Sequence, residues 1–85
     1  MYKNRGPDGR YNLCGRRVAA LRKSRSPRLS QRGLADLLQL SGLDLDKNAI
    51  QRIESGQRFV TDIELKALSQ VFEVPLEDLL STAWD

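Results

Sequence analysis

Apolar residues recur along this chain with the spacing of short amphipathic helices. Cys14, Val18 and Leu21 follow an i, i+4, i+7 pattern that predicts a first helix from about residue 13. Further stripes predict four more helices: Leu34, Ala35, Leu37 and Leu38; Ile50 and Ile53; Leu65, Leu68, Val71 and Phe72; and Leu76, Leu79 and Leu80. No stretch alternates apolar and polar residues as a half-buried strand does. The pattern therefore predicts an all-α fold of five short helices.

Capping residues indicate where these helices begin and end. Ser30 and Asp46 are good N-caps for the second and third helices. Residues 61–64 (TDIE) form a capping box at the start of the fourth helix. Gly56 is expected in the left-handed conformation just after the third helix, and Pro75 at the first position of the fifth.

Length and composition indicate one small globular domain. The chain has 85 residues, of which 40% are hydrophobic and 29% charged. No apolar run approaches the roughly 20 residues of a membrane span, and we see no signal peptide. Turn-forming residues near the start favour a flexible basic tail over residues 1–12, which leaves residues 13–85 as the folded domain.

The chemistry available to the chain argues against an enzyme. It has no histidine, the commonest general base and metal ligand. Its single cysteine, Cys14, excludes an internal disulfide and fits a reducing cytoplasm. Because Cys14 lies in an apolar helical register, we interpret it as part of the core and not as a nucleophile. We therefore expect no catalytic residue, metal, cofactor or small-molecule ligand.

The net charge of +3 conceals a strong asymmetry between the two parts of the chain. Residues 1–32 carry ten Lys or Arg against Asp8 alone, a net charge of +9. Residues 33–85 carry four basic and ten acidic residues, a net charge of −6. The basic part fits either an anionic partner such as nucleic acid or a solvated basic tail, and charge alone favours neither.

The third predicted helix has two unlike faces. Ile50 and Ile53 mark its apolar side. The opposite side carries only hydrogen-bonding side chains, none of them acidic: Lys47, Asn48, Gln51, Arg52 and Ser55. Arg and Lys match guanine O6 and N7, while Asn and Gln match adenine N6 and N7. This face is either an ordinary solvated surface or a base-reading one.

Glu54 lies at the border between these two faces. A carboxylate without a partner there would repel phosphate, so it should have a cationic partner inside the domain. Arg22, one residue beyond Leu21 on the first helix, is the candidate.

Several ordered motifs together resemble a known family. They are Leu29-Ser30-Gln31, Leu34-Ala35, Ile50-x-x-Ile53-Glu54-x-Gly56 and Val74-Pro75-Leu76-x-x-Leu79-Leu80. This series resembles the Cro and phage-repressor-like (XRE-type) helix-turn-helix family over roughly residues 13–80. The resemblance implies a compact five-helix, lambda-repressor-like domain that binds double-stranded DNA as a transcriptional regulator, usually a repressor. It also implies a supporting helix over residues 31–39 and a recognition helix over about 46–54 in the major groove.

The resemblance assigns roles to individual residues. Base-reading positions fall on Lys47, Asn48, Gln51 and Arg52, and phosphate contacts on Gln31 and Arg58. A buried ion pair between the first and third helices falls on Arg22 and Glu54. We add Arg32 and Ser55 as phosphate contacts, with Arg16, Arg17 and Arg28 as further basic candidates.

The sequence departs from the family pattern in one connection. Residues 39–48 (QLSGLDLDKN) make the turn between the second and third helices several residues longer than usual. The insertion lies directly before Lys47 and Asn48, so it affects the register of those two residues most. We expect Leu43 and Leu45 to pack this longer turn against the core.

Two further expectations concern partners. Family resemblance implies a homodimer, at least on DNA, bound to a palindromic operator; we expect contacts through the fourth and fifth helices and the segment near Trp84. Trp84 itself is interpreted as a packing or dimer-contact residue. The alternative function is a protein-interaction module or antitoxin component whose acidic C-terminal half faces a basic partner and which could also regulate its own operon.

Overall fold

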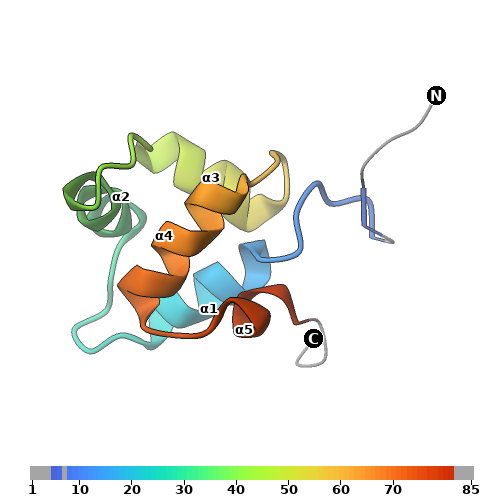
Figure 1. Ribbon diagram of the computed structural model, residues 1–85. Helices are drawn as coiled ribbons and strands as arrows, with labels where there is room; N and C mark the ends of the chain where they lie inside the picture. The colour runs from blue at the N-terminus through green and yellow to red at the C-terminus, as the bar shows by residue number, and fades with distance from the viewer. Residues whose placement is uncertain (1–4, 7, 82–85) are drawn as a thin grey trace.

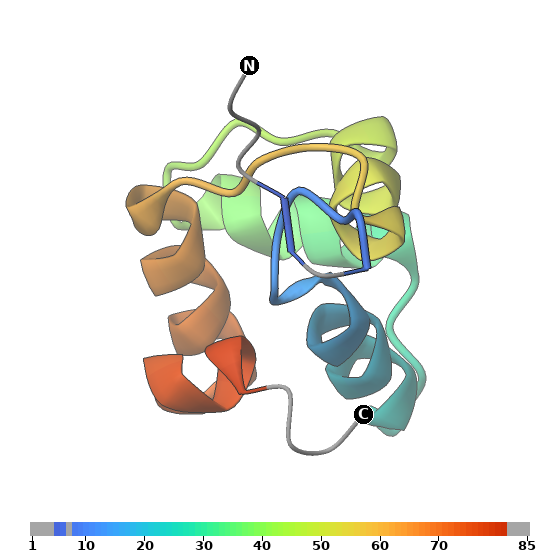
Figure 2. The ribbon, with the colours of Figure 1, turned by 90° about the vertical axis from the view of Figure 1, so that its right-hand side faces the viewer.

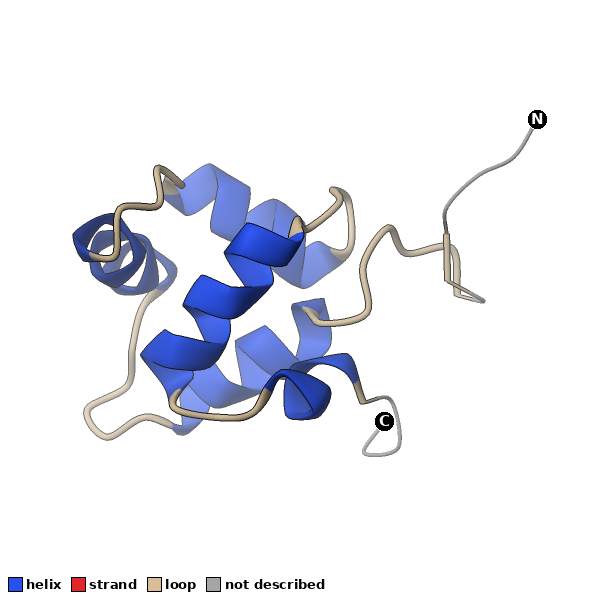
Figure 3. Ribbon diagram, in the orientation of Figure 1, coloured by secondary structure: helices blue, strands red, loops and turns tan. Residues whose placement is uncertain are grey.

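The described part of the chain folds into helices joined by short connections. The computed structural model describes residues 5–6 and 8–81. Within them lie five helices and no strand: α1 (Gly15–Ser24), α2 (Gln31–Leu40), α3 (Lys47–Ser55), α4 (Asp62–Phe72) and α5 (Leu76–Leu80) (Figures 1 and 3). This confirms the predicted all-α class and the order of its elements.

Side-chain caps hold the helix ends as expected. The Ser30 side chain accepts a hydrogen bond from the Gly33 N–H at the start of α2, and Asp46 accepts one from Ala49 at the start of α3. Thr61 and Glu64 form the predicted capping box of α4. These short polar side chains satisfy N–H groups that have no partner within their own helix.

One predicted helix boundary was wrong by a single residue. Pro75 was expected at the first position of α5, but it is the N-cap and the helix begins at Leu76. The reason is the backbone: Pro75 has φ −69° and ψ 155°, which is extended and not helical.

The core lies where α1, α2, α3 and α4 converge, and α5 closes it from one side (Figures 1 and 2). Fully buried side chains come from all five helices and, with Cys14, from the residue just before α1: Val18, Leu34, Leu38, Ile50, Ile53, Leu68 and Leu79. Because each helix is short, this shared apolar contact is what stabilises it; an isolated helix of about ten residues is marginal in water.

The long connection between α2 and α3 packs against the hydrophobic core. Leu45 is buried in the core, and Leu43 packs against it with partial burial. The Leu43 N–H also donates to the Leu38 carbonyl over 3.0 Å, which satisfies the end of α2. The expected role of these two leucines is confirmed.

Cys14 is buried beside the start of α1 with 1% of its surface exposed. Burial raises the pKa of its thiol to about 11, because the thiolate would lose its hydration. The side chain is therefore a neutral core residue over the whole physiological pH range.

Among the described residues, no helix is long and apolar enough to cross a membrane.

The start of α1 touches the end of α3 more closely than a side chain would allow. A Cβ atom on Gly15 would lie 2.1 Å from the Ile53 carbonyl oxygen and 2.9 Å from the Asn12 side-chain oxygen. Glycine at this position lets the two helix ends meet backbone to backbone.

Gly15→Ala is therefore expected to destabilise the fold although alanine is the better helix former. The added methyl must push α1 away from α3, and overpacking of this kind costs about 1–3 kcal/mol. Urea or thermal unfolding measures it. Gly33→Ala is the matched control, since its Cβ would meet the movable tip of Leu29 at 2.9 Å, and we expect less than about 1 kcal/mol of change. Equal effects of the two substitutions would contradict the close approach.

Candidate nucleic-acid interface

The outer face of α3 carries the side chains that the sequence assigned to base reading. Ile50 and Ile53 are completely buried, which fixes the rotation of the helix. Five residues of α3 other than these are exposed: Lys47, Asn48, Gln51, Arg52 and Ser55. The structure thus presents donors and acceptors of the predicted kind along one helix of nine residues.

A buried ion pair lies directly behind this face. The Arg22 Nε and Nη2 atoms donate to the two Glu54 carboxylate oxygens over 2.7 and 3.0 Å. Only 9% of each side chain is exposed. Arg22 Nη1 also donates to the Leu29 carbonyl over 3.0 Å. The hydrogen bond to Glu54 raises the pKa of Arg22 above its ordinary value, so the guanidinium is held in its charged form.

Gln31 joins this pair from α2. Its Nε2 donates to Glu54 Oε1 over 3.0 Å, so Glu54 contacts both α1 and α2. An amide nitrogen has two hydrogens, and this bond uses one of them. Gln31 is therefore held in place by the ion pair at the position where the sequence predicts a phosphate contact.

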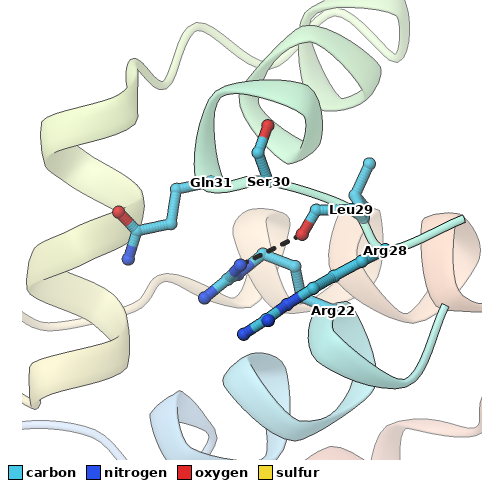
Figure 4. A pocket seen from close by; sticks show the side chains of 5 residues that line it. All are labelled: Arg22, Arg28, Leu29, Ser30 and Gln31. Atoms are coloured by element: carbon cyan, nitrogen blue, oxygen red, sulfur yellow. Dashed lines mark hydrogen bonds between the residues drawn. The ribbon is translucent and has the colours of Figure 1, made fainter.

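A pocket opens beside the start of α2. It is lined by Arg22, Arg28, Leu29, Ser30 and Gln31 (Figure 4). The charge of Arg22 is offset by Glu54, so Arg28 gives the pocket its net positive charge, and Gln31 reaches across toward α3. Positive side chains next to the first turn of a helix favour an anion, because the N–H groups of that turn also point outward.

Arg58, another expected phosphate contact, lies beside the start of α4. Its Nη2 lies 3.2 Å from Glu64 Oε2, and Glu64 belongs to the capping box of α4. The Arg58 Nη1 atom is buried without a hydrogen-bond partner. The side chain is thus directed toward the start of α4 with 29% of its surface exposed, and the structure does not bring it to the pocket at α2.

The remaining basic candidates are divided between different sides of the molecule. Arg28 and Arg32 are exposed near the start of α2. Arg17 pairs with Asp78 of α5 over 2.9 Å, at the side of the molecule away from α3 in Figures 1 and 2. Arg16 forms an ion pair with Asp8, with 3.4 Å between Nη2 and Oδ2. Ser55, the uncharged candidate, donates its hydroxyl to the Arg52 carbonyl over 3.3 Å.

Sequence reasoning missed the segment that precedes α1. The Asn12 side chain donates to the carbonyls of Ile53 and Arg58 over 3.1 and 2.9 Å, and Arg10 donates to the carbonyl of Glu54. The domain boundary at residue 13 stays a prediction, but residues 10–12 lie against α3. The hydrogen bond from the Gly15 N–H to the Asn12 side chain is local, but the contact of Asn12 with α3, some 40 residues later, has no local signal.

The comparison with known families agrees with this geometry. The sequence pattern of a helix-turn-helix family matches residues 18–79, which is most of the chain and includes α2 and α3. The chain belongs to the Cro/phage-repressor-type (XRE-type) helix-turn-helix family. No curated protein and no solved structure gives a match.

Membership of this family makes the protein a DNA-binding helix-turn-helix regulator. Within residues 5–6 and 8–81, no group of three His, Cys, Asp or Glu side chains is placed to hold a metal ion. The exposed face of α3 and the pocket at α2 both present side chains that can form hydrogen bonds with a nucleic acid.

Removing either member of the buried ion pair should strongly destabilise the protein. Arg22→Ala and Glu54→Ala each leave a buried charge without a partner, which typically costs about 3–5 kcal/mol. The double substitution should lose clearly less than the two single losses combined, because no charge is then stranded. Chemical unfolding of the four proteins provides the cycle. Small, additive losses would show that the pair contributes no more than an exposed one, about 1 kcal/mol at most.

Proposed function

We propose that this helix-turn-helix protein is a sequence-specific repressor that places α3 in the major groove of double-stranded DNA. One observation carries the proposal: the outer face of α3 exposes Lys47, Asn48, Gln51 and Arg52, with no carboxylate among them, while the buried side of the same helix is fixed in the core. An α-helix fits the major groove, and these side chains are the types that read base edges there.

The roles of the four side chains follow from their chemistry. Arg52 and Lys47 suit the two acceptors of guanine, and Asn48 and Gln51 suit the donor and acceptor of adenine. Each is exposed, so it can exchange its water for a base without breaking a contact inside the domain.

Phosphate contacts are proposed at the start of α2. Gln31 is oriented by Glu54, and Arg28 lines the adjoining pocket. Arg32, in the first turn of α2, is exposed and can add a further charge. Arg58 and Ser55 stay in the proposal as phosphate contacts at the C-terminal end of α3, and Arg58 must then share its guanidinium between Glu64 and phosphate.

A homodimer on a palindromic operator is the proposed assembly. Exposed apolar side chains on α4 and α5 support it: 70% of Ile63, 44% of Leu76 and 40% of Leu80 is exposed. Trp84, the other expected contact, lies outside the described residues. A selection of bound sites from random DNA should return two inverted half-sites about one helical turn apart. A consensus without such symmetry would contradict the dimer.

A role as a protein-binding module or antitoxin is the second candidate. The same exposed side chains of α4 and α5 favour it, since they could contact another protein. This role does not exclude DNA binding, because an antitoxin can also repress its own operon. If substitutions of the exposed α3 side chains did not change the affinity for the selected DNA, the protein-binding role would be favoured.

Asn48→Ala and Arg52→Ala test the assignment of the base readers. Each should cost about 1–3 kcal/mol on the selected site and relax the preference at one base pair, while binding to unrelated DNA changes less. Quantitative binding to a panel of single-base variants measures both effects. If Lys47→Ala or Gln51→Ala alters the consensus and Asn48→Ala does not, α3 is rotated relative to this proposal.

Salt dependence tests the phosphate contacts. If two subunits together neutralise about six phosphates, the slope of log K against log salt should be about −5. Arg28→Ala should weaken binding to all sequences alike and make the slope shallower by about 2 for the dimer, about 1 per subunit. A slope near zero in the native protein would show that these charges do not lie at a DNA interface.

A further inference from the structure

Residues 10–12, which we name the α3 strap, cross the C-terminal end of the recognition helix (Figure 2). The Tyr11 N–H donates to the Gly56 carbonyl over 2.9 Å. Asn12 donates to the carbonyls of Ile53 and Arg58, and Arg10 donates to that of Glu54. Three consecutive residues thus bond to carbonyls both in the last turn of α3 and in the loop after it.

The end of α3 is where such donors are most useful. The last carbonyls of a helix have no N–H partner within it, and together they carry a partial negative charge. Gly56, with φ 78°, turns the chain so that the N–H groups of Gly56 and Gln57 bond back to Ile53 and Arg52. The strap supplies further donors there, and the Arg10 guanidinium brings a positive charge to the negative end of the helix.

The strap also fits the space left by two glycines. A Cβ atom on Gly56 would lie 2.7 Å from Arg10 Nε and 2.8 Å from Arg10 Cγ, so the arginine side chain lies flat against the turn. On the other side, Asn12 Oδ1 accepts the Gly15 N–H over 2.8 Å. One Asn side chain therefore accepts the first N–H of α1 and donates to carbonyls at the end of α3.

An aromatic contact extends the strap to the next loop. The rings of Tyr11 and Phe59 meet edge to face with centroids 4.9 Å apart, and Arg5 lies over the Tyr11 ring at 4.6 Å. The loop that leaves α3 is thus held by the same segment that holds the helix end.

We infer that Arg10 and Asn12 are positioning residues for the recognition helix. The inference rests on the proposed function of α3. Base readout by paired hydrogen bonds needs donor–acceptor distances within a few tenths of an ångström, so the register and tilt of α3 must be fixed. The N-terminal end of α3 is held by Asp46, the middle by the core, and the C-terminal end by Gly56 and the strap.

Two substitutions separate the functions of the strap. Arg10→Met keeps an unbranched side chain over Gly56 but removes the charge and the donor to Glu54. Asn12→Asp keeps the acceptor for Gly15 and loses the donors to Ile53 and Arg58. Arg10→Lys is the conservative variant that should restore the charge, and Lys23→Met, at the exposed far end of α1, controls for the loss of one positive charge.

Amide hydrogen exchange without DNA provides the first measurement, at a temperature where every variant is fully folded. Loss of the charged donor in Arg10→Met, or of both amide hydrogen bonds in Asn12→Asp, should speed exchange of the Ser55, Gly56 and Gln57 amides about tenfold. In both of these variants the α2 amides should exchange within about twofold of the rates in the native protein. In Arg10→Lys and Lys23→Met, the amides at the end of α3 should also exchange within about twofold of the native rates. Unchanged exchange at the end of α3 in both variants would overturn the inference.

The ratio of affinities for selected and unrelated DNA provides the second measurement, and a purely stabilising role would not move it. Arg10→Met should lower this ratio about tenfold, with affinity for unrelated DNA changed less than about twofold, and Arg10→Lys should recover most of it. Equal loss on both DNAs would make Arg10 a phosphate contact and contradict positioning. A native protein without any preference would refute the proposed function instead, and the exchange data would still decide whether the strap holds α3.

Discussion

The buried pair between Arg22 and Glu54 is the interaction on which the arrangement of this domain depends. It joins α1 to α3 through two hydrogen bonds and receives a third from Gln31 of α2. Charges taken out of water are tolerated only when such bonds satisfy them, so each of the three helices is constrained by the other two. The same carboxylate therefore orients a proposed phosphate contact and anchors the helix that carries the proposed base readers.

Around this pair, the ends of α3 are held independently of its middle. Asp46 caps the first turn, Gly56 closes the last one, and the strap donates to the carbonyls of Ile53 and Glu54 in that last turn. A helix of nine residues would fray in isolation, and fraying would blur a pattern of base contacts. Because the ends and the buried side hold the helix, the side chains of the exposed face are available to contact DNA.

Local sequence signals predicted most of the fold, and nonlocal contacts account for what they missed. The cap hydrogen bonds of Ser30 and Asp46 join residues only three positions apart, so the local sequence reveals them. The partner of Glu54 was predicted from the helical angle of Glu54 and from the need to neutralise a buried charge. The pairing of Arg58 with Glu64 joins a loop to a capping box, and no periodicity reveals it. The strap joins residues more than 40 positions apart, so only the folded chain shows that residues 10–12 contact α3.

The central claim, that the outer face of α3 reads DNA in the major groove, is tested most directly by nuclear magnetic resonance of the protein bound to its selected duplex. Intermolecular nuclear Overhauser effects report which side chains lie beside which base protons. We expect contacts from Asn48 and Arg52 to protons on the major-groove edges of the bases, with the core residues of α3 unaffected. Contacts confined to α4 and α5, or to minor-groove protons, would contradict the account.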